Sequence, residues 1–78
     1  MPSTAIAHID YDAGTRRLGV TFVASGRRYV YADVPAALVA DFRQATSRGR
    51  FFNARIRDAF AIVSIEEPHA ASRPVVRP

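Results

Sequence analysis

The chain of 78 residues contains no cysteine and no lysine. Without cysteine there is no disulfide framework, no thiolate zinc site and no thiol nucleophile. No hydrophobic run approaches the ~18 residues that a membrane span needs. The first residues, Met1-Pro2-Ser3-Thr4, lack the basic region and apolar stretch of a signal peptide. These absences fit a reducing compartment, and we expect a cytoplasmic protein with no membrane partner.

The positive charge of the chain comes entirely from arginine. Eleven basic residues stand against seven acidic ones, which gives a formal net charge of +4. Arginine binds phosphate through its planar fork of donors and stacks on nucleic-acid bases. A compositional bias of the source genome accounts for the missing lysine equally well. In either case, a basic surface favours anionic partners.

The length allows one small domain with a thin margin of stability. A chain of this size buries only about 60% of the surface that it exposes when unfolded. With a hydrophobic share of 49%, the composition is that of an ordinary globular domain. Such a domain gains from burying further surface against a second copy or another protein.

Three strands are predicted in the first half of the chain, over residues 5–11, 18–23 and 27–32. In the second segment, Leu18, Val20 and Phe22 alternate with other residues at the period of a strand. The polar residues 12–15 suit a tight hairpin between the first two strands. Residues 24–26 suit a type I turn that is closed by a left-handed Gly26.

These loop lengths predict a register in which Ile9 lies opposite Leu18 and Val20 lies opposite Val30. A slip of one residue in either turn would move one strand's side chains to the opposite face. The register gives the sheet one mainly apolar face and one polar face. The apolar face carries Ala7, Ile9, Tyr11, Leu18, Val20, Phe22 and Val30; the other face carries Ile6, His8, Asp10, Arg17, Gly19, Thr21, Tyr29 and Tyr31, with Arg27 at its rim.

Two helices are expected after the strands. Asp33 is a good capping residue and Pro35 is tolerated in a first turn, while Val34, Leu38 and Phe42 form an apolar stripe. A second, shorter helix is predicted over 50–59, with Phe52, Ile56 and Phe60 on one side. We therefore expect an α+β domain over 5–65: a three-stranded antiparallel meander with two helices on its apolar face. A fourth strand over 61–65 stays open, and the proline-containing segment 66–78 is expected to be a disordered tail.

A series of motifs resembles the KTSC domain, a short module that occurs at the C-terminus of some lysyl-tRNA synthetases and as stand-alone bacterial proteins. The most specific motif is the string from Ser47 to Arg57. The matching features are Tyr11-Asp12, Leu18, Val20, Phe22, Gly26, Tyr29-Val30-Tyr31, Val34-Pro35, Ser47-Arg48-Gly49-Arg50-Phe51-Phe52-Asn53 and Ile56-Arg57. The turn before the tyrosine pair is one residue longer than usual, and Phe51 stands where tyrosine is common. The resemblance implies a small α+β domain of unsettled function, for which RNA binding has been suggested, and it supplies no catalytic residues.

The tyrosine pair and the arginines are the candidate binding residues. Tyr29 and Tyr31 share one face of a strand, and aromatic side chains on an open basic sheet stack unpaired bases. Cross-strand packing is the alternative for the pair, with Tyr31 covering Gly19. The candidate phosphate contacts are Arg17, Arg27, Arg48, Arg50, Arg55 and Arg57. For the arginines the alternative is a solvated helix face.

No residue pattern indicates catalysis, a metal or a cofactor. His8 and Asp10 share a face, but no serine or cysteine is placed beside them as a nucleophile. Ser47 fits a helix cap better than an anion site. We therefore expect a protein that is not an enzyme and needs no metal or cofactor.

Two functions stay open from the sequence. The first is binding of single-stranded or structured RNA through the tyrosine face and the arginines. The second is a protein-interaction or homo-oligomerisation role, in which the tyrosine face or the edge of the third strand pairs with another copy. A monomer or a weak homodimer fits either function.

Overall fold

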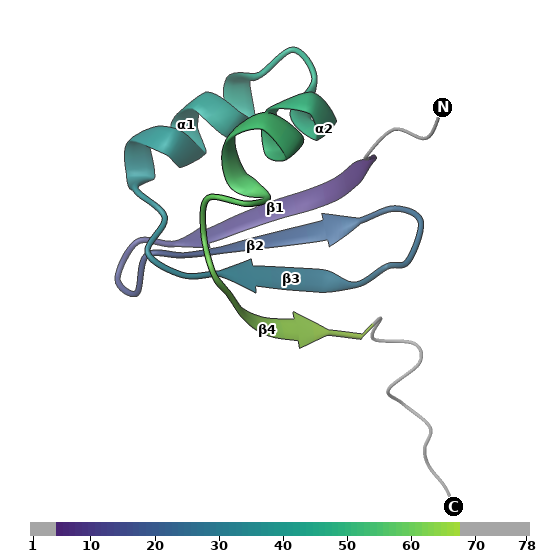
Figure 1. The fold of residues 1–78 in the computed structure, drawn as a ribbon, viewed down its shortest axis with the longest axis horizontal. Coiled ribbons are helices and arrows are strands. Elements are labelled where there is room, and N and C mark those ends of the chain that lie inside the picture. The colour runs from purple at the N-terminus through teal and green to yellow at the C-terminus, as the bar shows by residue number, and fades with distance from the viewer. Residues whose placement is uncertain (1–4, 68–78) are drawn as a thin grey trace, which may run out of the picture.

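The computed structural model describes residues 5–67 and shows one antiparallel sheet with helices on one side (Figure 1). The sheet has four strands in the order β1-β2-β3-β4, and every neighbouring pair is antiparallel. The strands are β1 Ile6–Asp12, β2 Arg17–Phe22, β3 Arg28–Tyr31 and β4 Ile62–Glu66. This confirms the α+β class, the meander and the fourth strand that the sequence left open.

The connection from β3 to β4 contains the helices, which we call the helical layer. It comprises α1 Ala36–Gln44, α2 Arg48–Phe51 and η1 Phe52–Ile56, a π-helix that continues directly from α2. Ser47 caps α2, since its hydroxyl accepts a hydrogen bond from the backbone N–H of Arg50 at 3.3 Å. The helical layer lies toward the β1 side of the sheet, and β4 lies farthest from it (Figure 1).

Asp33 does not cap the first helix as its residue type suggested. It has a φ of 59°, in the left-handed region, and forms part of the bend that leads out of β3. The helix instead begins after Pro35, which makes no side-chain capping hydrogen bond. The bend is fixed by the backbone of Val34, whose N–H donates to the carbonyl of Arg16 at 2.9 Å.

The hydrophobic core lies between the helical layer and one face of the sheet, which we call the inner face. Phe42, Leu18, Ile56, Val20 and Val34 are its largest fully buried side chains. Ile9, Tyr31, Val39 and Phe52 complete the buried cluster. The predicted stripes of both helices therefore face the sheet, as the periodicity indicated.

The first hairpin keeps the predicted faces although its pairing differs by two residues. Tyr11 lies opposite Leu18 and Ile9 opposite Val20, because the four-residue loop begins one position later than predicted. A shift of two residues preserves the side-chain alternation. A bulge before His8 changes the end of β1: Ile6 packs against the core, and Ala7, predicted to be in the core, is exposed.

The second hairpin reverses the predicted faces of β3. Val20 lies opposite Tyr29, not Val30, because the loop after Phe22 has four residues where three were predicted. Gly26 does adopt the predicted left-handed conformation, with φ 72°. The one-residue change moves Tyr29 and Tyr31 to the inner face, and Val30 to the outer face. The prediction that the tyrosine pair lies on an open sheet face is therefore wrong.

An ionic cluster occupies the outer face of the sheet. The guanidinium of Arg28 contacts Asp10 at 2.6 Å and Glu66 at 2.9 Å, and so joins β1, β3 and β4. Arg28 and Asp10, not Tyr31, cover Gly19 on the strand between them. Glu66, expected in the tail, belongs to β4. The remaining tail residues 68–78 lie outside the described part of the chain.

Candidate ligand pocket

Four aromatic rings form a continuous row between the sheet and the helical layer; we call it the aromatic row. Tyr31 packs edge-on against Phe52 with 5.7 Å between ring centroids. Phe52 contacts Phe22 at 5.2 Å, and Phe22 contacts Tyr29 at 5.3 Å, again edge to face. This geometry is the favourable one for aromatic pairs. The row thus builds a continuous apolar wall from β2, β3 and η1.

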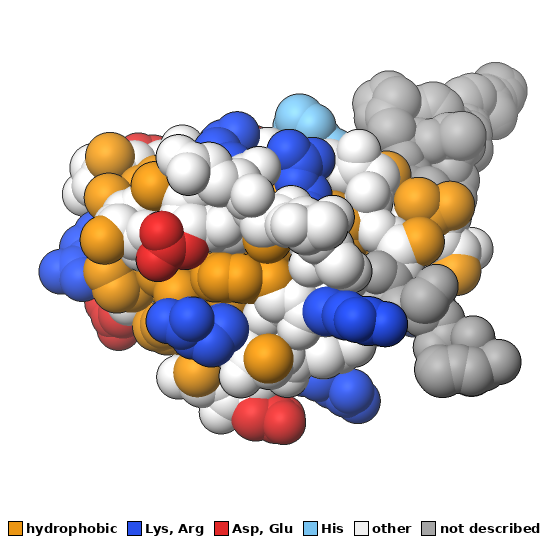
Figure 2. All heavy atoms as spheres, turned by 90° about the horizontal axis from the view of Figure 1, so that it is seen from above, with side chains coloured by type: hydrophobic (Ala, Val, Ile, Leu, Met, Phe, Trp, Pro, Cys, Tyr) orange, Lys and Arg blue, Asp and Glu red, His pale blue; other side chains and the backbone are white. Residues whose placement is uncertain are grey.

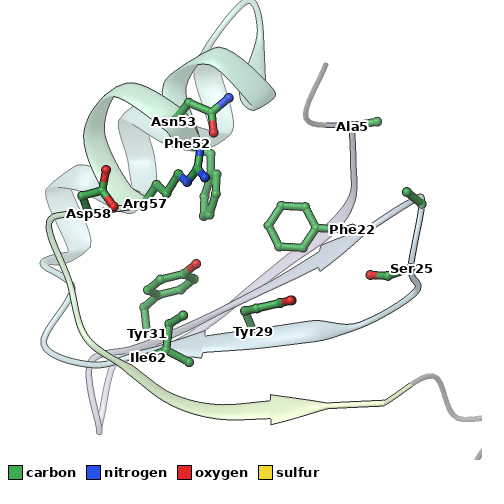
Figure 3. A pocket seen from close by; sticks show the side chains of 11 residues that line it. Ala5, Phe22, Ser25, Tyr29, Tyr31, Phe52, Asn53, Arg57, Asp58 and Ile62 are labelled. Carbon is green, nitrogen blue, oxygen red and sulfur yellow. The ribbon is translucent and has the colours of Figure 1, made fainter. Parts of the chain in front are cut away.

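A pocket of about 570 Å³ opens along this row, where the helical layer ends short of β4 (Figure 3). Its volume falls within the range of about 300–1,000 Å³ that is usual for small-molecule sites. Figure 3 shows Phe52 and Arg57 on the helical side and Phe22, Tyr29 and Tyr31 on the sheet side. The lining residues are Ala5, Phe22, Ala24, Ser25, Tyr29, Tyr31, Phe52, Asn53, Arg57, Asp58 and Ile62.

The π-helix η1 places polar groups at the mouth of the pocket. The backbone N–H of Arg57 donates to the carbonyl of Phe52 at 2.8 Å, five residues back. Asn53 and Arg57 line the pocket from successive turns, while Phe52 and Ile56 are buried. Single π-turns of this kind are rare and occur often at functional sites. The pocket therefore combines an apolar wall with an exposed cation, Arg57, and an adjacent exposed carboxylate, Asp58.

The two tyrosines contribute differently to the pocket. Tyr31 is only 2% exposed and belongs to the core. Burial raises the pKa of its hydroxyl, which stays protonated at neutral pH. Tyr29 is half-buried at the pocket's sheet side. Tyr29 thus offers ring surface to a ligand, whereas Tyr31 supports the wall from behind.

Arginines without a salt bridge gather on the helical layer. Between residues 36 and 60 there are five arginines and two aspartates, and no salt bridge within residues 5–67 involves these five. Arg55 lies over the ring of Phe51, 5.3 Å from its centroid. Seen from the helical side, hydrophobic surface is exposed between separate groups of arginine side chains (Figure 2).

The structure brings together only part of the predicted site. Of the eight predicted residues, Tyr29, Tyr31 and Arg57 line the pocket. Arg48, Arg50 and Arg55 are exposed on α2 and η1, outside the pocket lining.

The other two predicted arginines are placed differently. Arg27 is bound to Glu67 at 3.1 Å, and this hydrogen bond raises its pKa. Arg17 alternates with Leu18 and so lies on the outer face of β2, away from the pocket.

Sequence reasoning missed several pocket residues. Phe22 and Phe52 were assigned to the core alone, and Ile62 to a strand that stayed open. The string from Ser47 to Arg57 did single out the segment that carries Phe52, Asn53 and Arg57. The π-turn that aims the last two at the pocket has no recognisable sequence signal.

The histidine on the outer face, His8, lies near a carboxylate that an arginine already binds. His8 and Asp10 do share that face, as predicted, but Arg28 holds the Asp10 carboxylate at 2.6 Å. Among residues 5–67 no group of three histidine or acidic side chains is arranged to hold a metal ion. Within the same range, no helix has the length and hydropathy to cross a bilayer.

Comparison with known proteins identifies the family. The sequence profile of the KTSC domain matches residues 2–60, about three quarters of the chain. The chain belongs to the KTSC domain family. The crystal structure of a KTSC domain protein from Yersinia pestis is similar, with a TM-score of 0.72 and 35% sequence identity over 80% of this chain and 86% of that one. No curated protein matches the sequence significantly.

Most of the pocket lies within the residues that match the KTSC profile. The KTSC match includes β1 to η1 and ends at residue 60, before β4 begins at Ile62. The aromatic row and Arg57 therefore all lie inside the matched region, and β4 lies outside it. The wall of the pocket belongs to the KTSC domain, whereas its β4 side is formed by residues beyond the match.

Proposed function

We propose that this KTSC domain is a non-catalytic binding module for single-stranded RNA. An unpaired base enters the pocket against the aromatic row, and the sugar-phosphate chain runs over the helical layer. The observation that supports this proposal most is the juxtaposition of the pocket with five arginines that have no acidic partner among the described residues.

The pocket has the chemistry that an unpaired base needs. Stacking of bases on aromatic side chains is worth about 1–3 kcal/mol per base and tolerates any base. Phe22 and Tyr29 are half-buried and present ring surface. Beside them, Arg57 supplies a cation at the pocket mouth. A base inserted here meets apolar surface on one side and a phosphate contact next to it.

The arginines of the helical layer fit a backbone track. Arg48, Arg50 and Arg55 are exposed on one continuous helical segment with Arg57. Phosphate contacts supply affinity without sequence preference, because each one releases condensed counterions. Arg17 and Arg27 have no part in the proposed site, since one lies on the outer face and the other is paired with Glu67.

The test is fluorescence anisotropy with short labelled single-stranded RNAs at low salt. Tyr29→Leu keeps apolar bulk and removes the ring, so binding should weaken at least about fivefold, the equivalent of about 1 kcal/mol. Phe60→Leu is the matched control, because Phe60 is also half-buried against the core but lies outside the pocket lining. Circular dichroism checks that both variants fold.

Two results would contradict the proposal. One is a wild-type Kd above about 1 mM at low salt, which would be weaker than ordinary single-strand binding. The other is equal weakening by Tyr29→Leu and Phe60→Leu, which would place the bound RNA outside the pocket. In the first case the pocket is better explained as a receptor for an apolar side chain of a protein partner.

A further inference from the structure

We propose that the free edge of β4 pairs with β4 of a second copy of this chain and forms a weak symmetric dimer. β4 is the last strand of the sheet, and no described strand pairs with its other side. All five of its residues are exposed. Three of the four large hydrophobic side chains exposed within residues 5–67 are in it: Ile62, Val63 and Ile65, at 46%, 46% and 51%.

Little protects this edge against pairing. Sheet edges are normally guarded by charged residues, prolines, covering elements or bulges; of these, β4 has a register irregularity at Val63 and the charged Glu66 at its end. Residues 61–65 carry no charge and no proline, and the three exposed hydrophobic residues are β-branched, which suits a sheet. The helical layer also stops short of β4 and leaves its inner side uncovered (Figure 1).

Glu66, the last residue of β4, and Glu67, which follows it, each bind an arginine of their own chain. Arg28 binds Glu66 at 2.9 Å, and Arg27 binds Glu67 at 3.1 Å. Neither carboxylate therefore confronts its counterpart in a second copy as an unpaired like charge. This pairing favours a partner segment that is itself uncharged and apolar, and residues 62–65 of another copy have that chemistry.

Symmetry fixes the arrangement of the proposed dimer. Two identical edge strands pair antiparallel around a two-fold axis perpendicular to the sheet, so both helical layers lie on the same face. Ile62 and Ile65 lie opposite Tyr31 and Tyr29 of β3 and therefore both belong to the inner face. The register that keeps faces matched places Ile62 opposite Ile65 of the second copy, twice across the axis.

The dimer also extends the surface beside the ligand pocket. Ile62 is both a residue of the β4 edge and a wall of the pocket. Pairing across β4 therefore brings two pockets to the same face, one on each side of the axis. The proposal rests on the edge strand alone and does not depend on which ligand the pocket takes.

The first test measures mass by light scattering over a concentration series up to about 1 mM, because a five-residue strand pair forms a small, weak interface. Wild type should move toward twice 8.6 kDa as concentration rises. Ile65→Lys should weaken self-association at least about tenfold, since the charge enters the interface twice. Val23→Lys is the matched control: Val23 is 60% exposed in the β2–β3 loop, and dimerisation should be unchanged.

The second test is directed at the register. Paired residues in antiparallel strands have Cα atoms about 4.5–5.5 Å apart, within the range of disulfides. The chain has no cysteine, so Ile62→Cys with Ile65→Cys should give a covalent dimer on mild oxidation. Within one chain these two positions are about 10 Å apart along the strand and cannot bridge. Val23→Cys should cross-link only at the slow rate of random collision.

Three results would overturn the proposal. They are a mass of one chain at every concentration, a dimer that Ile65→Lys leaves intact, and a double-cysteine variant that cross-links no faster than Val23→Cys. Because Ile65 is half-exposed, Ile65→Lys should melt near the wild-type temperature; a variant that fails to fold would leave the disulfide test to decide.

Discussion

Arg28 on β3 binds Asp10 on β1 across an intervening strand, with 2.6 Å between Nη2 and Oδ2. A second contact, from Nε to Oδ1, measures 3.0 Å, so the pair is bidentate. Gly19 on β2 lies directly beneath it. A Cβ at this position would approach Arg28 Nε and Asp10 Oδ1 to 2.5 Å each. The absence of a side chain at Gly19 is therefore what lets the two strands be joined.

Gly19→Ala should destabilise the fold by about 1–3 kcal/mol, because the methyl group must displace the ion pair or shift the strand. In a domain of this size the melting temperature should fall by at least about 4 °C. Gly14→Ala is the matched control: its Cβ would come no closer than 3.3 Å to the Asp12 carboxylate, in an exposed turn.

A mutant cycle can distinguish a clash with the Arg28–Asp10 ion pair from a general effect of Gly19→Ala on β2. With Arg28→Ala and Asp10→Ala in place, Gly19→Ala has room and should cost little or stabilise the strand. An equal loss of stability in both backgrounds would show that the ion pair is not what requires glycine.

The ion pair between Arg28 and Asp10 should make the stability of the fold depend on pH. The hydrogen bond from Arg28 lowers the pKa of Asp10 below its ordinary value of 3.8. A carboxyl whose pKa is lower in the folded state stabilises the fold above about pH 4, and this stabilisation is lost as pH falls through the folded-state pKa. Since the side chains are 32% and 40% exposed, the contribution should be at most about 1 kcal/mol.

Asp10→Asn should therefore lower the melting temperature at pH 7 and reduce the difference between pH 7 and pH 3. Asp41→Asn is the control, because Asp41 is exposed on α1 and has no salt bridge among the described residues. Thermal melts across pH measure both effects. Parallel curves for wild type and Asp10→Asn would exclude a pH-dependent role for the pair.

The main error in the predicted fold, the face assignment of β3, comes from the length of one loop. Period-two alternation located the strands, and the apolar stripes located the helices, since both patterns report local geometry. To predict which side chains of β3 face the helical layer, the length of the loop after Phe22 must be known to within one residue. Alternation in β3 gave no help, because Tyr29, Val30 and Tyr31 are all suited to burial, and all three are half-buried or buried.

The candidate site was harder to predict than the fold. Tyr29, Tyr31 and Arg57, three of the predicted site residues, line one pocket, whereas the prediction placed the two tyrosines on an open sheet face. The pocket depends on how far the helical layer reaches over β3, and that distance follows from tertiary packing. Arg28, the central residue of the outer face, was not among the candidates, because its partner on β1 is 18 residues away.

Two tyrosine hydroxyls provide a matched pair of substitutions. The Tyr11 hydroxyl donates to the backbone carbonyl of Val34 at 2.7 Å and ties β1 to the bend before α1. Tyr11→Phe leaves that carbonyl without its donor and should cost about 1 kcal/mol. Tyr31 makes no side-chain hydrogen bond among the described residues, so Tyr31→Phe should be neutral or stabilising. Chemical denaturation measures both; a larger loss for Tyr31→Phe would show that its hydroxyl has a structural role.

Two truncations separate β4 from the residues that follow it. Residues 68–78 lack apolar periodicity, so a chain that ends at Glu67 should keep the wild-type melting temperature. A chain that ends at Ala61 loses β4 and the Glu66 partner of Arg28, and exposes Val30, which is now 6% exposed. It should lose more than about 2 kcal/mol. Equal melting temperatures for the two truncated chains would show that β4 adds no stability.

Salt dependence should distinguish the arginine track from the aromatic pocket. With about three phosphates engaged, affinity for single-stranded RNA should fall roughly 20-fold between 50 and 200 mM salt. Arg55→Gln with Arg57→Gln should reduce this slope, because fewer counterions are released, whereas Tyr29→Leu should weaken binding at every salt concentration and keep the slope. Arg17→Gln is the control for charge alone, since Arg17 lies on the outer face. Anisotropy titrations across salt measure all four proteins, and a slope that Arg17→Gln reduces as much as Arg57→Gln would place the RNA on the wrong face for this proposal.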